Sequence, residues 1–224
     1  MSTTGIFLIC TIVPLLFGLW AQFRVKRTFN RYSQVPTTNG MTGAQAAAAV
    51  LQASGLEGVS IRPVAGRLSD HYDPRSRTLN LSEDVGQAAT VAAIGVAAHE
   101  AGHAIQDAQG YKPMRIRQTL VPAAQIGQSL WFFPVFLGLI LGSVGLVNVR
   151  LVLFLAIVLF QLVTLPVEFD ASNRALVALE GNALLAPPEL DGARAVLRAA
   201  ALTYVAALVA SIGQLIYFFL ASRR

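Results

Sequence analysis

The chain of 224 residues is 54% hydrophobic and only 13% charged, whereas soluble domains usually carry about 25% charged residues. This deficit indicates a membrane protein with room for one globular domain of modest size. The net charge of +5 is not a nucleic-acid signal, because the basic residues gather beside apolar runs, and the single cysteine excludes an intramolecular disulfide and a cysteine-based metal site.

The first predicted element is an apolar run from Gly5 to Phe23, which is long enough to cross a bilayer. No positive charge precedes this run, and a basic cluster follows it. That order is the reverse of a signal peptide, so we expect an uncleaved membrane anchor at residues 1–23.

The next segment, residues 24–129, is polar enough to form a water-soluble domain. Thr42 is placed to cap an Ala-rich helix, and the alternating Val59–Val64 and Thr78–Leu81 predict two short strands. The Asp and Pro content of Ser69–Pro74 predicts a turn or loop between them. If the second strand lies at an edge of its sheet, a substrate could bind there by strand addition.

A long helix is predicted after the second strand. Ser82 is placed to cap it, and Glu83 and Asp84 stand in its first turn, where acidic side chains interact favourably with the helix dipole. Gly110 ends the helix after about Ala108.

The motif on this helix carries the chemistry, because His99, Glu100 and His103 form a His-Glu-x-x-His sequence. Residues four apart on a helix are turned by about 40° from each other, so both imidazoles lie on one face and can bind one tetrahedral Zn²⁺ ion. Glu100 can take a proton from a zinc-bound water, whose pKa the metal lowers to about 7. The chain has only three histidines, and two of them fall in this pattern, which favours a metal site over unrelated helix-borne histidines.

Two further apolar runs, Leu130–Val147 and Leu151–Val167, follow the soluble segment. Only Asn148, Val149 and Arg150 separate them, which predicts a turn at these residues and a transmembrane helical hairpin over residues 130–167.

A catalytic zinc site needs a third protein ligand, and the residues alone leave two candidates. Glu168 stands at the end of the third apolar run, in a helix that can continue to about Gly181, and acidic residues at such depth are functional candidates by default. His71 is the only other histidine. The long metzincin form is excluded, because glutamines stand at positions 106 and 109 where it requires glycine and histidine.

Three passages resemble the YugP-like bacterial membrane zinc metallopeptidases, across nearly the whole chain. They are the 68–75 loop with 79–82 after it, residues 97–106, and residues 165–172. The resemblance implies kinship with the membrane gluzincins, which include CAAX prenyl proteases and heat-shock membrane proteases and whose third zinc ligand is a Glu on a later helix. By resemblance that ligand falls on Glu168. Those relatives often have Asn four residues before this Glu and Asp four after it, where this chain has Thr164 and Ser172, so Asp170 is the candidate for the missing supporting carboxylate.

Two alternative functions stay open. Site-2-type intramembrane proteases pair the histidine motif with a later Leu-Asp-Gly, which here would make Asp191 the ligand, although the prolines before it also suit an ordinary helix start. Val85–Ala98 lacks the Leu, Ile and Phe content of the apolar runs, which speaks against a lipid-embedded zinc helix. The other alternative is a non-catalytic scaffold or adaptor with a structural zinc, but such a closed site has no use for Glu100.

A fourth apolar run, Ala199–Ala221, predicts a C-terminal transmembrane helix over residues 199–224. Residues 24–129 carry eleven Lys or Arg, and residues 168–198 carry three more. The positive-inside rule therefore predicts that both segments are cytoplasmic, in a bacterial inner membrane.

We thus expect a mainly α-helical membrane protein with about four transmembrane helices and a small α+β zincin-like domain. The expected function is a zinc-dependent endopeptidase. Its expected partners are a protein or peptide substrate, the lipid bilayer and unidentified membrane proteins, with no nucleic acid.

Overall fold

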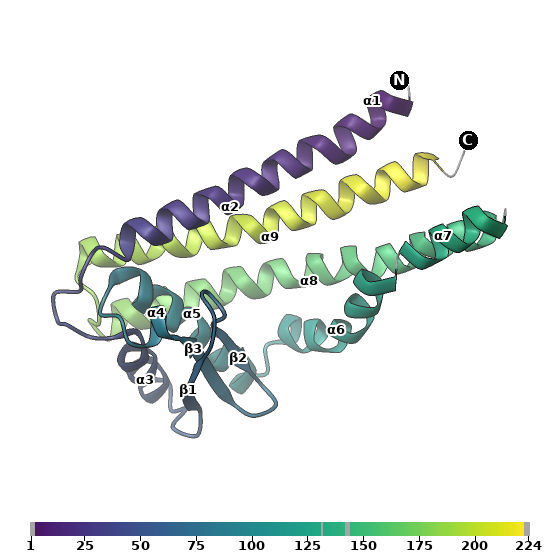
Figure 1. Ribbon diagram of the computed structural model, residues 1–224. Coiled ribbons are helices and arrows are strands. Elements are labelled where there is room, and N and C mark those ends of the chain that lie inside the picture. Colours follow the sequence, from purple (N-terminus) through teal and green to yellow (C-terminus); the bar gives the residue numbers. More distant parts are fainter. Residues whose placement is uncertain (1–2, 131, 142–143, 222–224) are drawn as a thin grey trace. The chain divides into compact units, whose positions relative to one another are not determined.

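The computed structural model describes residues 3–130, 132–141 and 144–221, and the fold is mainly helical with one small sheet (Figure 1). The chain divides into two compact units. The first comprises Met1–Gln22, Lys112–Pro166 and Leu202–Arg224, and the second comprises Phe23–Tyr111 and Val167–Ala201. Three helices contribute residues to both units, namely α2 (Val13–Tyr32), α8 (Val144–Gly181) and α9 (Pro187–Ala221).

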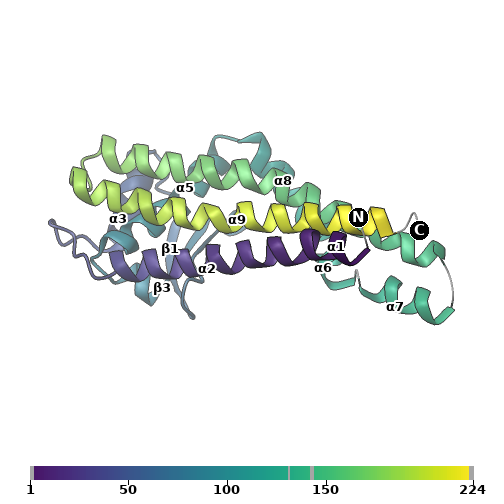
Figure 2. The same cartoon turned by 90° about the horizontal axis from the view of Figure 1, so that it is seen from above.

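The first unit is built from apolar helices. Besides its parts of α2, α8 and α9 it contains α1 (Thr3–Phe7), the π-helix η1 (Leu8–Ile12), α6 (Lys112–Leu130) and α7 (Phe132–Leu141). Within this unit α2 and α9 run side by side, as Figures 1 and 2 show, and they pack so closely that a Cβ atom at Gly213 would lie 3.2 Å from the Pro14 ring.

Among the described residues, three helices are long and apolar enough to cross a membrane: Gly5–Tyr32, Leu151–Gly181 and Pro187–Leu220. They contain three of the four predicted spans. The fourth, Leu130–Val147, includes positions 131, 142 and 143, which lie outside the described residues, and it stays a prediction.

The predicted turn at Asn148–Arg150 is wrong, because α8 already begins at Val144 and runs through these three residues. None of them is Gly or Pro. In a helix interior each lowers helix stability by only up to about 0.7 kcal/mol relative to Ala. A short polar interruption between apolar runs is therefore too weak a signal to end a helix.

The second unit contains the sheet, whose strands are β1 (Ser60–Val64), β2 (His71–Asp73) and β3 (Thr78–Ser82). The strand order is β1-β3-β2, with β3 parallel to β1 and antiparallel to β2. Both predicted strands are confirmed, but part of the predicted loop forms β2, which at three residues is too short to show an alternating pattern. Because β3 is the central strand, strand addition to it is excluded.

Helices of the second unit pack beside this sheet (Figure 1). Thr42 caps α3 (Gly43–Ala53) through a reciprocal capping box with Gln45, as the sequence predicted for an Ala-rich helix there. The single long helix predicted after β3 is instead divided into α4 (Glu83–Gly86) and α5 (Val91–Ala108).

Different side-chain contacts mark the starts of these two helices. Ser82 directly precedes α4, but its hydroxyl donates to Asp70 and makes no capping hydrogen bond. The side chain of Thr90 accepts the Ala93 N–H and starts α5 afresh. The C-terminal end is as predicted, with α5 ending at Ala108 and Gly110 in the left-handed region at φ +65°.

Candidate metal centre

Two helices of the second unit supply the candidate metal ligands. His99, Glu100 and His103 lie on α5, and Glu168 lies on the part of α8 that belongs to this unit. The helices pack closely because α5 has a glycine at the crossing point: a Cβ atom at Gly102 would lie 3.1 Å from the carbonyl carbon of Ala171. The absence of a side chain there lets the imidazoles reach the carboxylate.

The ligand atoms converge on one point. Glu168 Oε2 lies 3.2 Å from His99 Nε2 and 3.7 Å from His103 Nε2, and the three ligand atoms lie within 4.8 Å of one another. In a tetrahedral zinc site with bonds of about 2.0–2.1 Å, ligand atoms are about 3.3 Å apart. The group therefore fits a tetrahedral ion with a position left for another ligand.

The site is buried, which makes its charges depend on one another. Glu168 is only 2% exposed, and Glu100 and His103 are also buried. Burial lowers the pKa of His103, but the hydrogen bond and negative charge of Glu168 outweigh it and leave this pKa above its ordinary value. A carboxylate this deeply buried needs cationic or hydrogen-bonding partners, and the histidines provide them when they are protonated.

Glu100 is oriented by the sheet. Its Oε2 accepts the backbone N–H of Tyr72, in β2, at 3.0 Å. The phenol of Tyr72 points elsewhere and donates to Asp107 Oδ2 at 3.0 Å. Burial and the neighbouring Asp107 raise the pKa of the Tyr72 phenol far above its ordinary value, so it stays neutral.

Two polar residues beside the histidines were missed by the sequence analysis. Ser172 Oγ lies 3.1 Å from His99 Nδ1, and Gln106 Oε1 lies 2.9 Å from His103 Nδ1. Helical spacing could have suggested both, since Gln106 follows His103 by three residues and Ser172 follows Glu168 by four. Asp170, the expected supporting carboxylate, contacts Gln106 Nε2 at 2.8 Å rather than a histidine.

The alternative third ligands lie apart from this group. His71 is exposed, with Nδ1 2.8 Å from the Ser69 carbonyl and Nε2 3.3 Å from Asn80 Nδ2. The Asp191 side chain is 74% exposed and forms an ion pair with Arg194 at 2.6 Å. Neither belongs to the group of potential ligands found among the described residues.

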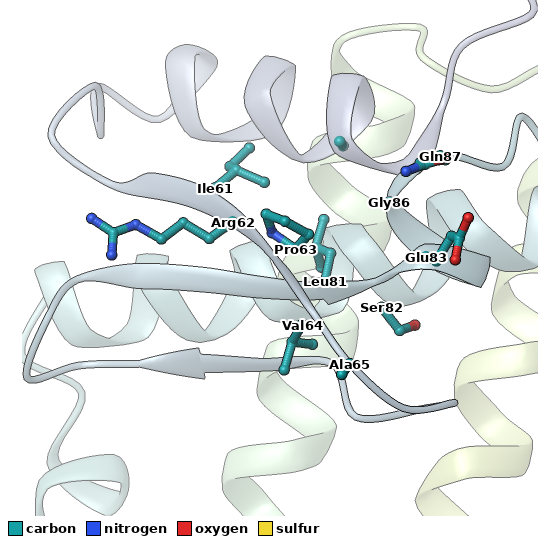
Figure 3. A pocket seen from close by; sticks show the side chains of 11 residues that line it. Ile61, Arg62, Pro63, Val64, Ala65, Leu81, Ser82, Glu83, Gly86 and Gln87 are labelled. Atoms are coloured by element: carbon teal, nitrogen blue, oxygen red, sulfur yellow. The ribbon is translucent and has the colours of Figure 1, made fainter.

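A cavity of about 680 Å³ lies beside β1, between the start of α3 and the α4 turn (Figure 3). Ile61, Pro63 and Leu81 line it, with Glu83 and Gln87 at its polar end. None of its lining residues belongs to the candidate metal centre, so this cavity is a separate feature of the second unit.

A family model described as "Putative neutral zinc metallopeptidase" matches residues 7–223 of the chain. The chain belongs to this family. It is also similar to the Bacillus subtilis (strain 168) protein described as "Putative membrane protease YugP", with 41% identity over 213 residues that cover 95% of each chain. No solved structure matched the chain. The resemblance stated from the sequence is thus confirmed.

Membership of a zinc metallopeptidase family agrees with the donor set of His99, His103 and Glu168. Two imidazoles and one carboxylate with an open position are ligands typical of catalytic zinc, whereas structural sites are usually closed by four protein ligands. The apolar helices agree with the membrane location in the relative's name.

Proposed function

We propose that this chain is a zinc-dependent endopeptidase of a bacterial inner membrane, in which His99, His103 and Glu168 hold Zn²⁺ and Glu100 is the general base. The observation that supports this most directly is the convergence of two imidazole nitrogens on one carboxylate oxygen, at 3.2 and 3.7 Å. Glu168 follows His99 by 69 positions and His103 by 65 positions in the sequence. The fold brings these three side chains together in the arrangement that one tetrahedral ion needs.

Zinc bound there would act as a Lewis acid and bring the pKa of a water close to neutrality. Glu100 then removes the proton from the attacking water and delivers it to the leaving amine. The Tyr72 N–H holds one carboxylate oxygen of Glu100, which restricts the side chain to one orientation. This preorganisation favours proton transfer, because no reorientation is needed as the reaction proceeds.

The strand edges suggest where a peptide substrate binds. The Ser60 N–H donates to the Arg77 carbonyl beside β3, so the backbone N–H groups of β1 point alternately toward β3 and away from it. Pro63 stands at one of the positions that face away, and proline has no N–H to offer to a peptide. The opposite edge is β2, whose Tyr72 N–H already points at Glu100. A peptide that lies along β2 would therefore be next to the general base, and full strand pairing there would have to displace Glu100 from the Tyr72 N–H.

The proposed location of the second unit is the cytoplasm. Residues 24–129 carry eleven Lys or Arg, and basic residues near membrane helices are retained on the cytoplasmic side.

Comparison of membranes that contain wild-type protein with membranes that contain Glu100→Gln tests the proposal. Glu100→Gln should keep about one zinc per chain, since the ligands remain, and should accumulate intact proteins that the wild type cleaves. Glu57→Gln is the matched control, because it makes the same chemical change at an exposed position and should behave as wild type. Zinc retention without any difference between the wild-type and Glu100→Gln proteomes would favour the scaffold with a structural zinc instead.

A further inference from the structure

Gln106 is a completely buried amide on α5, one helical turn after His103. Its side chain has three polar neighbours: His103 Nδ1 at 2.9 Å, the Val167 carbonyl oxygen at 2.8 Å and Asp170 Oδ2 at 2.8 Å. Buried amides are normally fully hydrogen-bonded, and these partners satisfy both amide hydrogens and the carbonyl. Gln106 thus connects the helix that carries the histidines with the helix that carries Glu168.

The identity of these partners allows only one orientation of the amide. A backbone carbonyl and a carboxylate can only accept hydrogen bonds, so the atom facing Val167 and Asp170 must be the NH₂ nitrogen. In the flipped orientation an amide oxygen would face two other oxygens at 2.8 Å. The carbonyl oxygen of Gln106 therefore faces His103.

This orientation determines the proton position on His103. The Gln106 oxygen can only accept, so His103 Nδ1 must donate to it. A neutral imidazole carries one proton, which leaves Nε2 with a free lone pair on the side that faces Glu168 Oε2 at 3.7 Å. We propose that Gln106 is a positioning residue that holds neutral His103 in the Nδ1–H tautomer, with Nε2 free for a metal. The use of that lone pair for zinc rests on the proposed function.

The two histidines differ in this respect. The partner of His99 Nδ1 is the hydroxyl of Ser172, which can donate or accept and so selects no tautomer, whereas the partner of His99 Nε2 is Glu168 Oε2 at 3.2 Å, an acceptor that favours a proton on Nε2 in the zinc-free protein. The Gln106 amide is held in turn by Asp170, whose Oδ2 also accepts from Arg174 Nε. Of the two histidines, only His103 is therefore directed to the Nδ1–H form.

Nitrogen NMR on zinc-free, full-length protein with ¹⁵N-labelled histidine reads the tautomer directly. The chain has only three histidines, so the variants His71→Asn and His103→Asn assign the signals. At a pH above its titration, His103 should show a protonated Nδ1 and an unprotonated Nε2. An Nε2–H form or a mixture in the wild type would overturn the proposal. The NMR experiment contains no metal and no substrate, so it tests the tautomer independently of the proposed function. A wild-type protein that shows this tautomer but binds no zinc would refute the proposed function and leave the tautomer proposal intact.

Two substitutions separate the role of the amide from a general packing role. Gln106→Met keeps the length of the side chain without its hydrogen bonds; it should release the tautomer and weaken zinc binding by about 10- to 100-fold, as loss of a partner of a ligand usually does. Gln109→Met, at an exposed glutamine that contacts Arg174, is the matched control and should change neither readout.

Unchanged tautomer and zinc affinity in Gln106→Met would contradict the positioning role. If Gln106→Met fails to fold, the wild-type spectrum still decides whether His103 carries its proton on Nδ1.

Discussion

Glu168 is the residue on which the candidate metal centre depends most. Its side chain is almost fully buried, and one of its oxygens faces both imidazoles. An isolated buried carboxylate costs several kcal/mol, so its position between two histidines indicates a partner role rather than a chance placement. A divalent cation would neutralise this carboxylate and satisfy both ring nitrogens together.

Substitution of the acidic residues should separate the ligand from its neighbours. Glu168→Ala should abolish activity and most zinc binding, because it removes one of the ligands. Asp170→Asn should weaken zinc by about 10- to 100-fold, because it disturbs the Gln106 amide. Asp191→Asn and His71→Ala should leave the zinc content unchanged, as measured by metal analysis of purified protein. Metal loss in Asp191→Asn with retention in Glu168→Ala would establish the site-2 type instead.

The residues of the site differ in how far the sequence could predict them. His99, Glu100 and His103 follow from spacing within one helix, which needs no tertiary information. Glu168 required its place at the end of an apolar run and the family resemblance. Gln106 contacts Val167 and Asp170, which follow it by 61 and 64 positions in the sequence. No local sequence pattern reports such a contact.

The α5–α8 crossing is the element-level feature that brings the ligands together. Gly102 and Ala171 are small residues, and both sit in the buried interior of the second unit. The contact is between a helix surface without a side chain and a backbone carbonyl, and a backbone cannot move aside as a flexible side chain can. The distance between the helices is therefore set by the absence of a Cβ atom at position 102.

Gly102→Ala should push α5 and α8 apart. The added methyl would meet the Ala171 carbonyl group, and such overpacking usually costs about 1–3 kcal/mol, more than the roughly 1 kcal/mol that Ala gains over Gly in a helix. The expected result is a lower thermal midpoint and weaker zinc binding. Gly18→Ala is the control, a helical glycine with nothing within 4 Å of an added Cβ; it should leave zinc binding unchanged and should not lower the thermal midpoint. Zinc affinity unchanged in Gly102→Ala would show that the crossing does not set the ligand geometry.

Secondary structure was predictable where neighbouring residues determine it. The prediction failed where a residue distant in the sequence makes the deciding contact. The capping box at Thr42 and the left-handed glycine at 110 are local, and both helix ends were predicted. Ser82 was assigned as a helix cap because its neighbours are acidic, but Asp70, twelve residues earlier, takes its hydroxyl. The break before Thr90 lies where Thr90 pairs with Pro36, and no local pattern reports that contact.

At the scale of the whole molecule, the candidate metal ligands are not shared between the two compact units. All the candidate ligands and their polar partners belong to the second unit, Phe23–Tyr111 and Val167–Ala201. Composition predicted apolar helices long enough to cross a membrane, and three such helices are found among the described residues. Helix orientation across the membrane rests on charge alone, and it is open to direct measurement.

Thiol labelling in intact cells tests this orientation. The chain has a single cysteine, so Cys10→Ser gives a background in which one new cysteine reports one position. Ser76 lies in the exposed β2–β3 turn, and Ser76→Cys should resist an impermeant reagent until the cells are permeabilised, because the basic residues of this segment favour the cytoplasmic side. Thr4→Cys should label in intact cells, since one span separates it from the second unit, and this holds whether or not Leu130–Val147 crosses the membrane. Labelling at position 76 together with protection at position 4 would reverse the orientation and place the catalytic side of the protein outside the cytoplasm.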